Sequence, residues 1–160
     1  MRSLIFGIFL GLFELIGAIL PGNCTKCDAY KCFEEKLSCG PKGYFTAFGY
    51  PNCRRFNEDV AIARLSPTGK LWANCTTNCL LDAIEGIFMT APATTCDQMK
   101  LLAFDSHVRC YVQCGFCDVC KTDKWALART YNYCDFFSVA VLKQVTAIVK
   151  TCGLFSCFTW

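Results

Sequence analysis

The clearest hydrophobic pattern in the chain begins at Ser66-Pro67. A serine hydroxyl can accept a hydrogen bond from the first turn of a helix, and proline fits the first helical position because its missing N–H has no partner there. Beyond this start, apolar positions recur three or four residues apart, at Trp72, Cys75, Cys79, Ala83, Ile84 and Ile87. The pattern predicts a helix from Pro67 whose buried face carries two cysteines.

Two further helices follow from the same spacing. One runs from about Asp97 to Gln113, and the other begins near Asp135, which can cap it, and ends at Thr151. The predicted buried face of the first holds Met99, Leu102, Ser106 and Cys110. That of the second holds Phe137, Val141, Leu142, Val145, Ile148 and Val149, opposite Lys143, Gln144 and Lys150. This last helix is amphipathic, so we expect it to pack on the protein and not to cross a membrane.

The remaining segments are shorter. Residues 23–39 carry a short helical pattern that Gly40-Pro41 ends, and Cys53 to Leu65 favours helix. We expect an ordered loop at residues 40–52, a break at residues 91–95 and an irregular, cysteine-pinned segment at residues 114–134. Strand patterns are nearly absent, and no linker or repeat divides the chain. The sequence therefore predicts a mainly α fold, a small disulfide-rich helical domain over residues 23–160.

The first 22 residues have the pattern of a secretory signal peptide. Met1-Arg2 supplies a positive end, and an apolar run of ten residues from Leu4 to Phe13 follows. Glu14 interrupts the apolar stretch and Pro21-Gly22 ends it, whereas a membrane-spanning helix needs about 20 predominantly apolar residues. The cleavage position is poorly marked, and an uncleaved membrane anchor is the alternative. We expect residues 1–22 to be removed and the mature chain to be extracellular.

All fifteen cysteines follow this signal, and their density is typical of a disulfide scaffold in an oxidising compartment. An odd number leaves at least one cysteine free or bound to a second chain. Cys152 and Cys157 lie near the C-terminus, where a thiol reaches another subunit most easily. We expect one of these two to form the interchain disulfide of a homodimer, and a buried free thiol is the alternative. Disulfides are expected at the others, which are Cys24, Cys27, Cys32, Cys39, Cys53, Cys75, Cys79, Cys96, Cys110, Cys114, Cys117, Cys120 and Cys134.

Charge and histidine content argue against nucleic-acid binding and catalysis. The formal net charge is +3 and the longest basic run is the pair Arg54-Arg55, so the footprint of a nucleic-acid-binding protein is missing. The single histidine, His107, follows Asp105 and Ser106 on a predicted helix, where adjacent side chains point about 100° apart and cannot form a relay. We interpret it as a polar histidine on the helix surface. No catalytic residue and no enzyme activity are expected.

Two close groups of cysteines bear on metal and redox chemistry. Cys114, Cys117 and Cys120 have the spacing of zinc ligands, but no second pair lies nearby, and oxidation competes with metal in an exported chain. Cys24 and Cys27 lack the strand-to-helix context of a redox-active pair. We expect disulfides in both groups, and neither a metal nor a cofactor.

Two Asn-x-Thr acceptors for N-glycosylation are present, at Asn23 and Asn74, and both have cysteine in the middle position. Asn23 abuts the expected cleavage site. Asn74 precedes Cys75, whose early pairing would hide the acceptor. Both are candidate sites, and a shift in mobility after endoglycosidase treatment tests them.

Residues 53–120 also carry three local features of a known family. CRRF at 53–56 is followed by LSPTGKLW at 65–72. Sixteen residues separate Cys79 from Cys96, thirteen separate Cys96 from Cys110, and Cys110-Tyr111 is followed six residues later by Cys117. In these features the chain resembles the stanniocalcin family of secreted glycoprotein hormones. The resemblance implies a helical, disulfide-linked, usually dimeric glycoprotein that acts in calcium and phosphate balance or restrains a secreted metalloprotease.

The sequence is therefore compatible with three functions. The leading hypothesis is hormone-like signalling through an unknown extracellular protein, either a receptor or a protease. A saposin-like binder of lipid or membrane surfaces is the second, since saposins are also helical, secreted and disulfide-rich, although they use six cysteines. The third is a cysteine-rich effector or protease inhibitor, which would present an exposed loop such as residues 40–52.

Overall fold

The computed structural model describes residues 24–131, 139–153 and 155–157, and these residues are almost entirely helical. The expected signal peptide, Asn23, Cys134, Asp135 and Phe137 lie outside the described residues. The elements are η1 (Lys26–Asp28), α1 (Ala29–Leu37), η2 (Phe45–Gly49), α2 (Tyr50–Asn57), α3 (Asp59–Arg64), α4 (Pro67–Thr90), α5 (Cys96–Gln113), α6 (Phe116–Thr122), α7 (Lys124–Thr130) and α8 (Val139–Cys152). No strand occurs in this part of the chain, so the predicted mainly α fold is confirmed.

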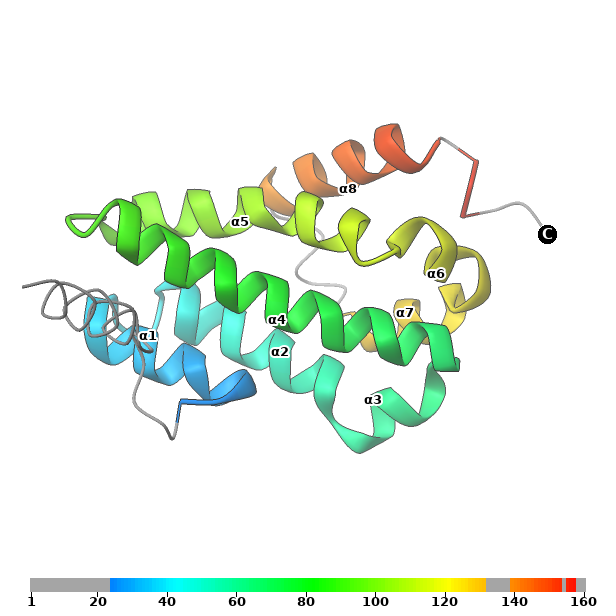
Figure 1. Cartoon of the computed structure of the whole chain (residues 1–160), viewed down its shortest axis with the longest axis horizontal. Coiled ribbons are helices and arrows are strands. Elements are labelled where there is room, and N and C mark those ends of the chain that lie inside the picture. The colour runs from blue at the N-terminus through cyan, green and yellow to red at the C-terminus, as the bar shows by residue number, and fades with distance from the viewer. Residues whose placement is uncertain (1–23, 132–138, 154, 158–160) are drawn as a thin grey trace, which may run out of the picture.

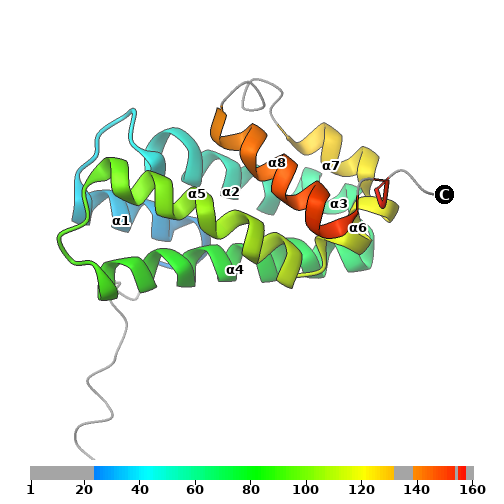
Figure 2. The same ribbon diagram turned by 90° about the horizontal axis from the view of Figure 1, so that it is seen from above.

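The long helix α4 runs the length of the molecule and organises the others around it (Figure 1). Helix α5 returns antiparallel to α4, and the N-terminal helices α1, α2 and α3 lie along the other side of α4. The short helices α6 and α7 lie at the end where α4 begins. Helix α8 packs on α5, as the view from above shows (Figure 2).

The two central helices begin where the sequence predicts. The Ser66 hydroxyl accepts a hydrogen bond from the Gly69 N–H at 3.1 Å and caps α4. At the start of α5 the Thr95 hydroxyl accepts from the Gln98 N–H at 3.3 Å, while the Gln98 side chain accepts from the Thr95 N–H at 3.0 Å. This capping box ends the predicted break at residues 91–95.

Two segments predicted to be irregular are helical instead. In residues 40–52, only the turn around Gly40 (φ 78°) is irregular, and the chain then forms η2 and the start of α2. Tyr44 and Phe45 are buried there, and a Cβ at Gly49 would overlap the Tyr30 ring, so this glycine marks a close helix contact. In the second segment, which is described as far as residue 131, Gly115 (φ 94°) makes a turn and α6 and α7 follow. Burial of aromatic and aliphatic side chains outweighs the low helix propensity that the prediction relied on.

The buried faces of the helices differ in part from the predicted ones. On α5, Leu102 is 42% exposed, whereas Ala103 and His107 are buried. On α8, Gln144 lies half-buried and donates a hydrogen bond to the Phe104 carbonyl at 2.9 Å. Cys75, predicted to be buried on α4, is exposed. Because α5 packs against both α4 and α8, its buried surface is wider than one stripe: it keeps Met99 and Cys110 of the predicted face and adds Ala103 and His107.

Seven disulfides cross-link the described residues, and they correct one prediction. The pairs are Cys24–Cys32, Cys27–Cys53, Cys39–Cys96, Cys75–Cys114, Cys79–Cys110, Cys117–Cys152 and Cys120–Cys157. Cys152 and Cys157, expected to supply an interchain bridge, are both bonded within the chain, because the end of α8 lies beside α6. Cys134 is the one cysteine that these pairs leave, and it lies outside the described residues.

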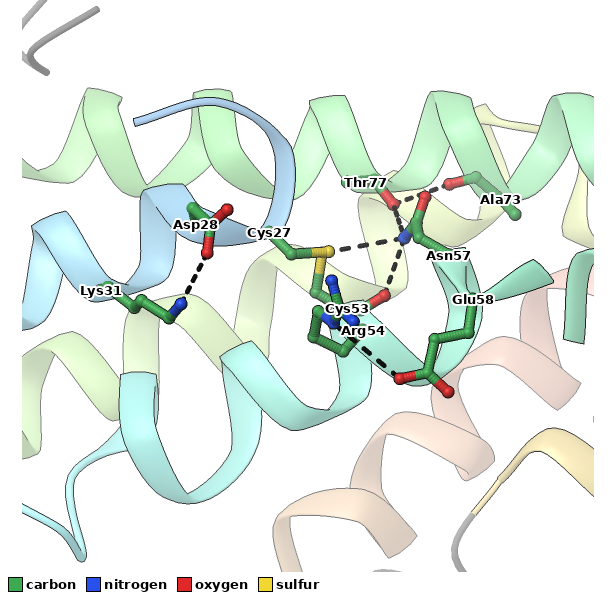
Figure 3. The surroundings of a disulfide bond; sticks show 9 residues. All are labelled: Cys27, Asp28, Lys31, Cys53, Arg54, Asn57, Glu58, Ala73 and Thr77. Carbon is green, nitrogen blue, oxygen red and sulfur yellow. Dashed lines mark hydrogen bonds and ion pairs between the residues drawn. A yellow bond between two sulfur atoms is a disulfide. The ribbon is translucent and has the colours of Figure 1, made fainter. Parts of the chain in front are cut away.

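Several of the disulfides join neighbouring helices. Cys75 and Cys79 are one turn apart on α4, and they pair with Cys114 and Cys110 at the end of the antiparallel α5. Cys27–Cys53 ties the N-terminal turn to α2, where the Asn57 side chain contacts the Cys53 sulfur at 3.7 Å and donates to its carbonyl at 2.8 Å (Figure 3). Such a density of disulfides fits a secreted, cysteine-rich extracellular protein. None of the described helices is long and apolar enough to span a membrane.

Candidate functional site

A cavity of about 400 Å³ lies inside the helical domain. The buried apolar side chains form two clusters, one around Tyr30, Phe33 and Phe88 and the other around Trp72 and Leu127. Tyr30 of the first cluster and Trp72 and Leu127 of the second all line the cavity. The cavity therefore occupies the region where the two clusters meet.

The walls of the cavity come from helices far apart in the sequence, namely α1, α2, α4, α5, α6, α7 and α8. Cys53 and Cys120 line it, so the disulfides Cys27–Cys53 and Cys120–Cys157 hold two of its walls. At α8 the wall reaches the protein surface, because Val145 lines the cavity and is 38% exposed. These cross-links join α2 to the N-terminal turn and α6 to the residues after α8.

His107 is part of the cavity wall, and its position corrects the prediction of a surface histidine. The side chain is 4% exposed, and Nδ1 lies 2.7 Å from the Ala103 carbonyl oxygen. The rings of Tyr44 and Phe104 pack against the imidazole at centroid distances of 6.3 and 5.7 Å. Burial lowers the pKa of His107 to about 4, although its backbone hydrogen bonds oppose the shift. The imidazole is therefore neutral at physiological pH.

Four tyrosines supply further polar groups near the cavity. Burial raises the pKa of Tyr30, Tyr44, Tyr111 and Tyr131, so all four phenols remain protonated at physiological pH. Tyr30 and Tyr44 interact through their hydroxyls, as do Tyr111 and Tyr131. Among the described lining residues only Lys124, which is half-buried, carries a charge at this pH. The cavity is thus uncharged over most of its surface.

Two polar atoms in the wall have no hydrogen-bond partner among the described residues. They are Trp72 Nε1 and Thr76 Oγ1, whose side chains are 2% and 6% exposed. The neighbouring Thr77 differs, because its hydroxyl donates to the Ala73 carbonyl at 2.9 Å and accepts from the Asn57 amide at 3.0 Å (Figure 3). Buried polar groups in proteins are nearly always paired, so two unpaired atoms on one helix face call for an explanation.

The other predicted site residues have separate positions. Twelve of the thirteen cysteines expected in disulfides are paired, while the thirteenth, Cys134, lies outside the described residues. Asn74 is exposed on α4, although Thr76 of the same acceptor is buried. Within residues 24–131, 139–153 and 155–157, no group of three or more His, Cys, Asp or Glu side chains is placed to hold a metal ion.

Sequence reasoning missed the cavity, although two signals pointed toward it. Cys75 and Cys79 are four residues apart, as are Cys110 and Cys114, which is the spacing of paired cross-links between antiparallel helices. Thr76 and His107 are polar residues on helix faces that are otherwise apolar or aromatic. Trp72 and Leu80 lie four residues from Thr76, and Ala103 and Tyr111 lie four residues from His107. Neither signal gives the separation between helices, which determines the cavity volume.

Comparisons of this chain with models of known protein families, with curated proteins and with solved structures find no match. The function is accordingly argued from the cavity and its surroundings.

Proposed function

We propose that this protein is a secreted carrier that binds a small apolar molecule in the cavity between α4 and α8. The observation that supports this proposal is an internal space of about 400 Å³, which falls within the range of about 300–1,000 Å³ typical of small-molecule sites. Aromatic and aliphatic side chains make up most of its wall, as in sites that exclude water from an apolar ligand.

The energetics of the fold support the same proposal. A cavity in an apolar core lowers stability roughly in proportion to its volume, so a domain retains one at a cost. Disulfides offset that cost by restricting the unfolded chain, each contributing about 2–4 kcal/mol. A ligand that fills the cavity restores the lost contacts, and its binding adds to the stability of the folded state.

A fluorescence titration with the neutral probe N-phenyl-1-naphthylamine tests the carrier proposal. We expect saturable binding of one probe per chain with a blue-shifted, enhanced emission, because the probe leaves water. The variant Val149→Trp adds bulk to a residue that lines the cavity, and it is expected to weaken binding at least tenfold.

Val139→Trp is the matched control, since Val139 lies on the same helix and is 70% exposed. Its affinity for the probe should equal that of the wild type. Equal affinity in all three proteins would place the probe elsewhere and refute the proposal, provided that the melting temperatures of the variants match.

A second candidate function is binding of another extracellular protein, and the outer face of α8 favours it. Val139, Leu142 and Val145 are 70%, 54% and 38% exposed there. A second copy of this chain is the occupant that the odd cysteine count favours. The hormone-like role implied by the stanniocalcin resemblance belongs to this proposal, as does glycosylation at Asn74 or Asn23.

Sedimentation equilibrium of wild-type protein and of Leu142→Lys tests this second candidate. A dimer should weaken at least tenfold in Leu142→Lys, while Leu71→Lys, a change at a side chain 72% exposed on α4, should leave it unchanged. Both variants are compared with and without Cys134→Ser, which separates a covalent dimer from a non-covalent one. A monomer in every case would exclude self-association, and flotation with liposomes would instead favour the saposin-like alternative.

A further inference from the structure

We propose that the ligand of the cavity is an uncharged, mainly apolar molecule with a hydrogen-bond-accepting oxygen, which Trp72 and Thr76 bind together. This inference rests on the carrier function proposed above and names the chemical class of its ligand.

Trp72 and Thr76 lie close together on α4. Trp72 and Thr76 are four residues apart, so their side chains lie on the same face of the helix, one turn from each other. Both side chains line the cavity, and both are more than nine-tenths buried. One ligand can therefore contact both polar groups, which lie one turn apart on the part of the wall that α4 forms.

The two side chains are also free to bind a ligand. Trp72 Nε1 and Thr76 Oγ1 have no hydrogen-bond partner among the described residues. Burying such a group without a partner is unfavourable, because the group loses its hydrogen bonds to water. Thr77, the next residue, shows that the same helix can satisfy a threonine hydroxyl through the carbonyl four residues earlier. Both threonines line the cavity, but only the Thr76 hydroxyl is left for a ligand.

The hydrogen bonds that the two groups can form restrict the ligand. An indole N–H can only donate a hydrogen bond, whereas a threonine hydroxyl can donate or accept. A ligand that satisfies both groups at once needs an acceptor, and a carbonyl oxygen has two lone pairs for two donors. A ketone, aldehyde or ester group on an apolar skeleton fits this requirement.

The charge of the cavity wall determines whether the acceptor is neutral or anionic. His107 is buried and neutral, and the tyrosines around the cavity are protonated. A buried carboxylate needs a paired cation or several donors to offset its desolvation. Lys124 on α7 is the one charged residue among the described lining residues, and neither of the two unpaired groups on α4 is charged. The wall at Trp72 and Thr76 therefore favours a neutral acceptor over an anion.

Competition between matched ligands tests the inference. 2-Acetylnaphthalene carries a ketone where 2-ethylnaphthalene carries a methylene group, and each is used to displace N-phenyl-1-naphthylamine from the protein. In Thr76→Val we expect the affinity for the ketone to fall about five- to tenfold and the affinity for 2-ethylnaphthalene to stay within about twofold of its wild-type value, since a methyl group replaces the hydroxyl with little change of shape. Trp72→Phe removes the indole N–H together with one ring, so both affinities change. In this variant we expect the ratio of the ketone affinity to the 2-ethylnaphthalene affinity to fall about five- to tenfold.

Two controls make the comparison specific. Thr76 completes the glycosylation acceptor at Asn74, so all proteins carry Asn74→Gln. Thr77→Val removes a hydroxyl that also lines the cavity but is already hydrogen-bonded to the protein, and it should leave the ratio of the two affinities unchanged. If Trp72→Phe does not fold, the ratio in Thr76→Val decides alone.

The outcomes separate the two proposals. If both naphthalenes bind but the variants leave their affinity ratio unchanged, water or nothing pairs with the two groups, and this inference is wrong while the carrier proposal stands. Tighter binding of 2-naphthoate than of the ketone at neutral pH would overturn the uncharged character of the ligand. If none of these compounds displaces the probe and the probe itself does not bind, the carrier proposal fails as well.

Discussion

At the scale of single residues, Thr76 and Thr77 are adjacent on α4 and differ in one respect. The Thr77 hydroxyl is hydrogen-bonded to Ala73 and Asn57, whereas the Thr76 hydroxyl is buried without a partner among the described residues. Replacing a buried, unpaired hydroxyl by a methyl group removes a desolvation penalty, while replacing a paired one removes a hydrogen bond.

We therefore expect opposite effects on the stability of the ligand-free protein. Thr76→Val should raise the free energy of unfolding by about 1 kcal/mol, and Thr77→Val should lower it by about 1 kcal/mol. Urea unfolding with all disulfides intact, in the Asn74→Gln background, measures both. Equal destabilisation by the two changes would mean that the Thr76 hydroxyl is paired in solution.

His107 gives the folded protein a specific dependence on pH. Its pKa is about 4 in the folded chain and about 6.5 when exposed, so between these values the unfolded chain binds a proton that the folded chain does not. The free energy of unfolding should fall by about 3 kcal/mol as the pH is lowered from 6.5 to 4.

Urea unfolding at a series of pH values, in wild type and His107→Gln, measures this contribution. The glutamine variant should lose most of the dependence between pH 6.5 and 4, because its side chain does not titrate. An identical pH dependence in both proteins would show that the pKa of His107 is the same in the folded and unfolded chains, as for a solvent-exposed imidazole.

At the scale of elements, the disulfides determine how α8 is held over the cavity. Cys117–Cys152 joins the end of α8 to α6, and Cys120–Cys157 joins the residues after α8 to the same helix. The rest of the contact between α8 and α5 includes Gln144, which binds the Phe104 carbonyl. Helix α8 is thus cross-linked at its C-terminal end.

Removing a disulfide at α8 should affect ligand binding more than removing one elsewhere. The double variant Cys117→Ala, Cys152→Ala is expected to weaken binding of N-phenyl-1-naphthylamine about tenfold, since the wall formed by α8 loses its anchor. The matched control is Cys24→Ala, Cys32→Ala, a pair that does not line the cavity. Each double variant should lose about 2–4 kcal/mol of stability. Equal affinity in the two double variants would show that the Cys120–Cys157 bridge and packing hold α8 without Cys117–Cys152.

Part of this architecture was predictable from the sequence because it depends on local interactions. The starts of α4 and α5 follow from Ser66-Pro67 and from Thr95 after a break, where one or two side chains satisfy the free N–H groups of the first turn. The mainly α fold follows from the spacing of apolar residues in these helices. Such features need no knowledge of the rest of the chain.

The errors concern interactions between distant segments. Residues 40–52 contain glycine and proline and yet are largely helical, since Tyr44 and Phe45 are buried against α1, α4 and α5. His107 is buried for the same reason. The pairing of Cys152 and Cys157 depends on the position of α8 beside α6, which no local pattern encodes. The cavity depends on all of these positions at once.

At the scale of the whole molecule, two apolar clusters meet around a space, and seven disulfides cross-link the described residues. A domain of this size that only needed stability would gain more by filling the space with side chains. Its wall instead combines mainly apolar side chains with neutral polar groups and Lys124. We therefore expect a ligand to occupy this space.

A crystal structure of the protein with bound 2-acetylnaphthalene tests whether a ligand occupies this cavity. We expect electron density for the ligand between α4 and α8, with its carbonyl oxygen within hydrogen-bond distance of Trp72 Nε1 and Thr76 Oγ1. Ligand density only on the outer face of α8, with side chains or ordered water filling the interior, would contradict it.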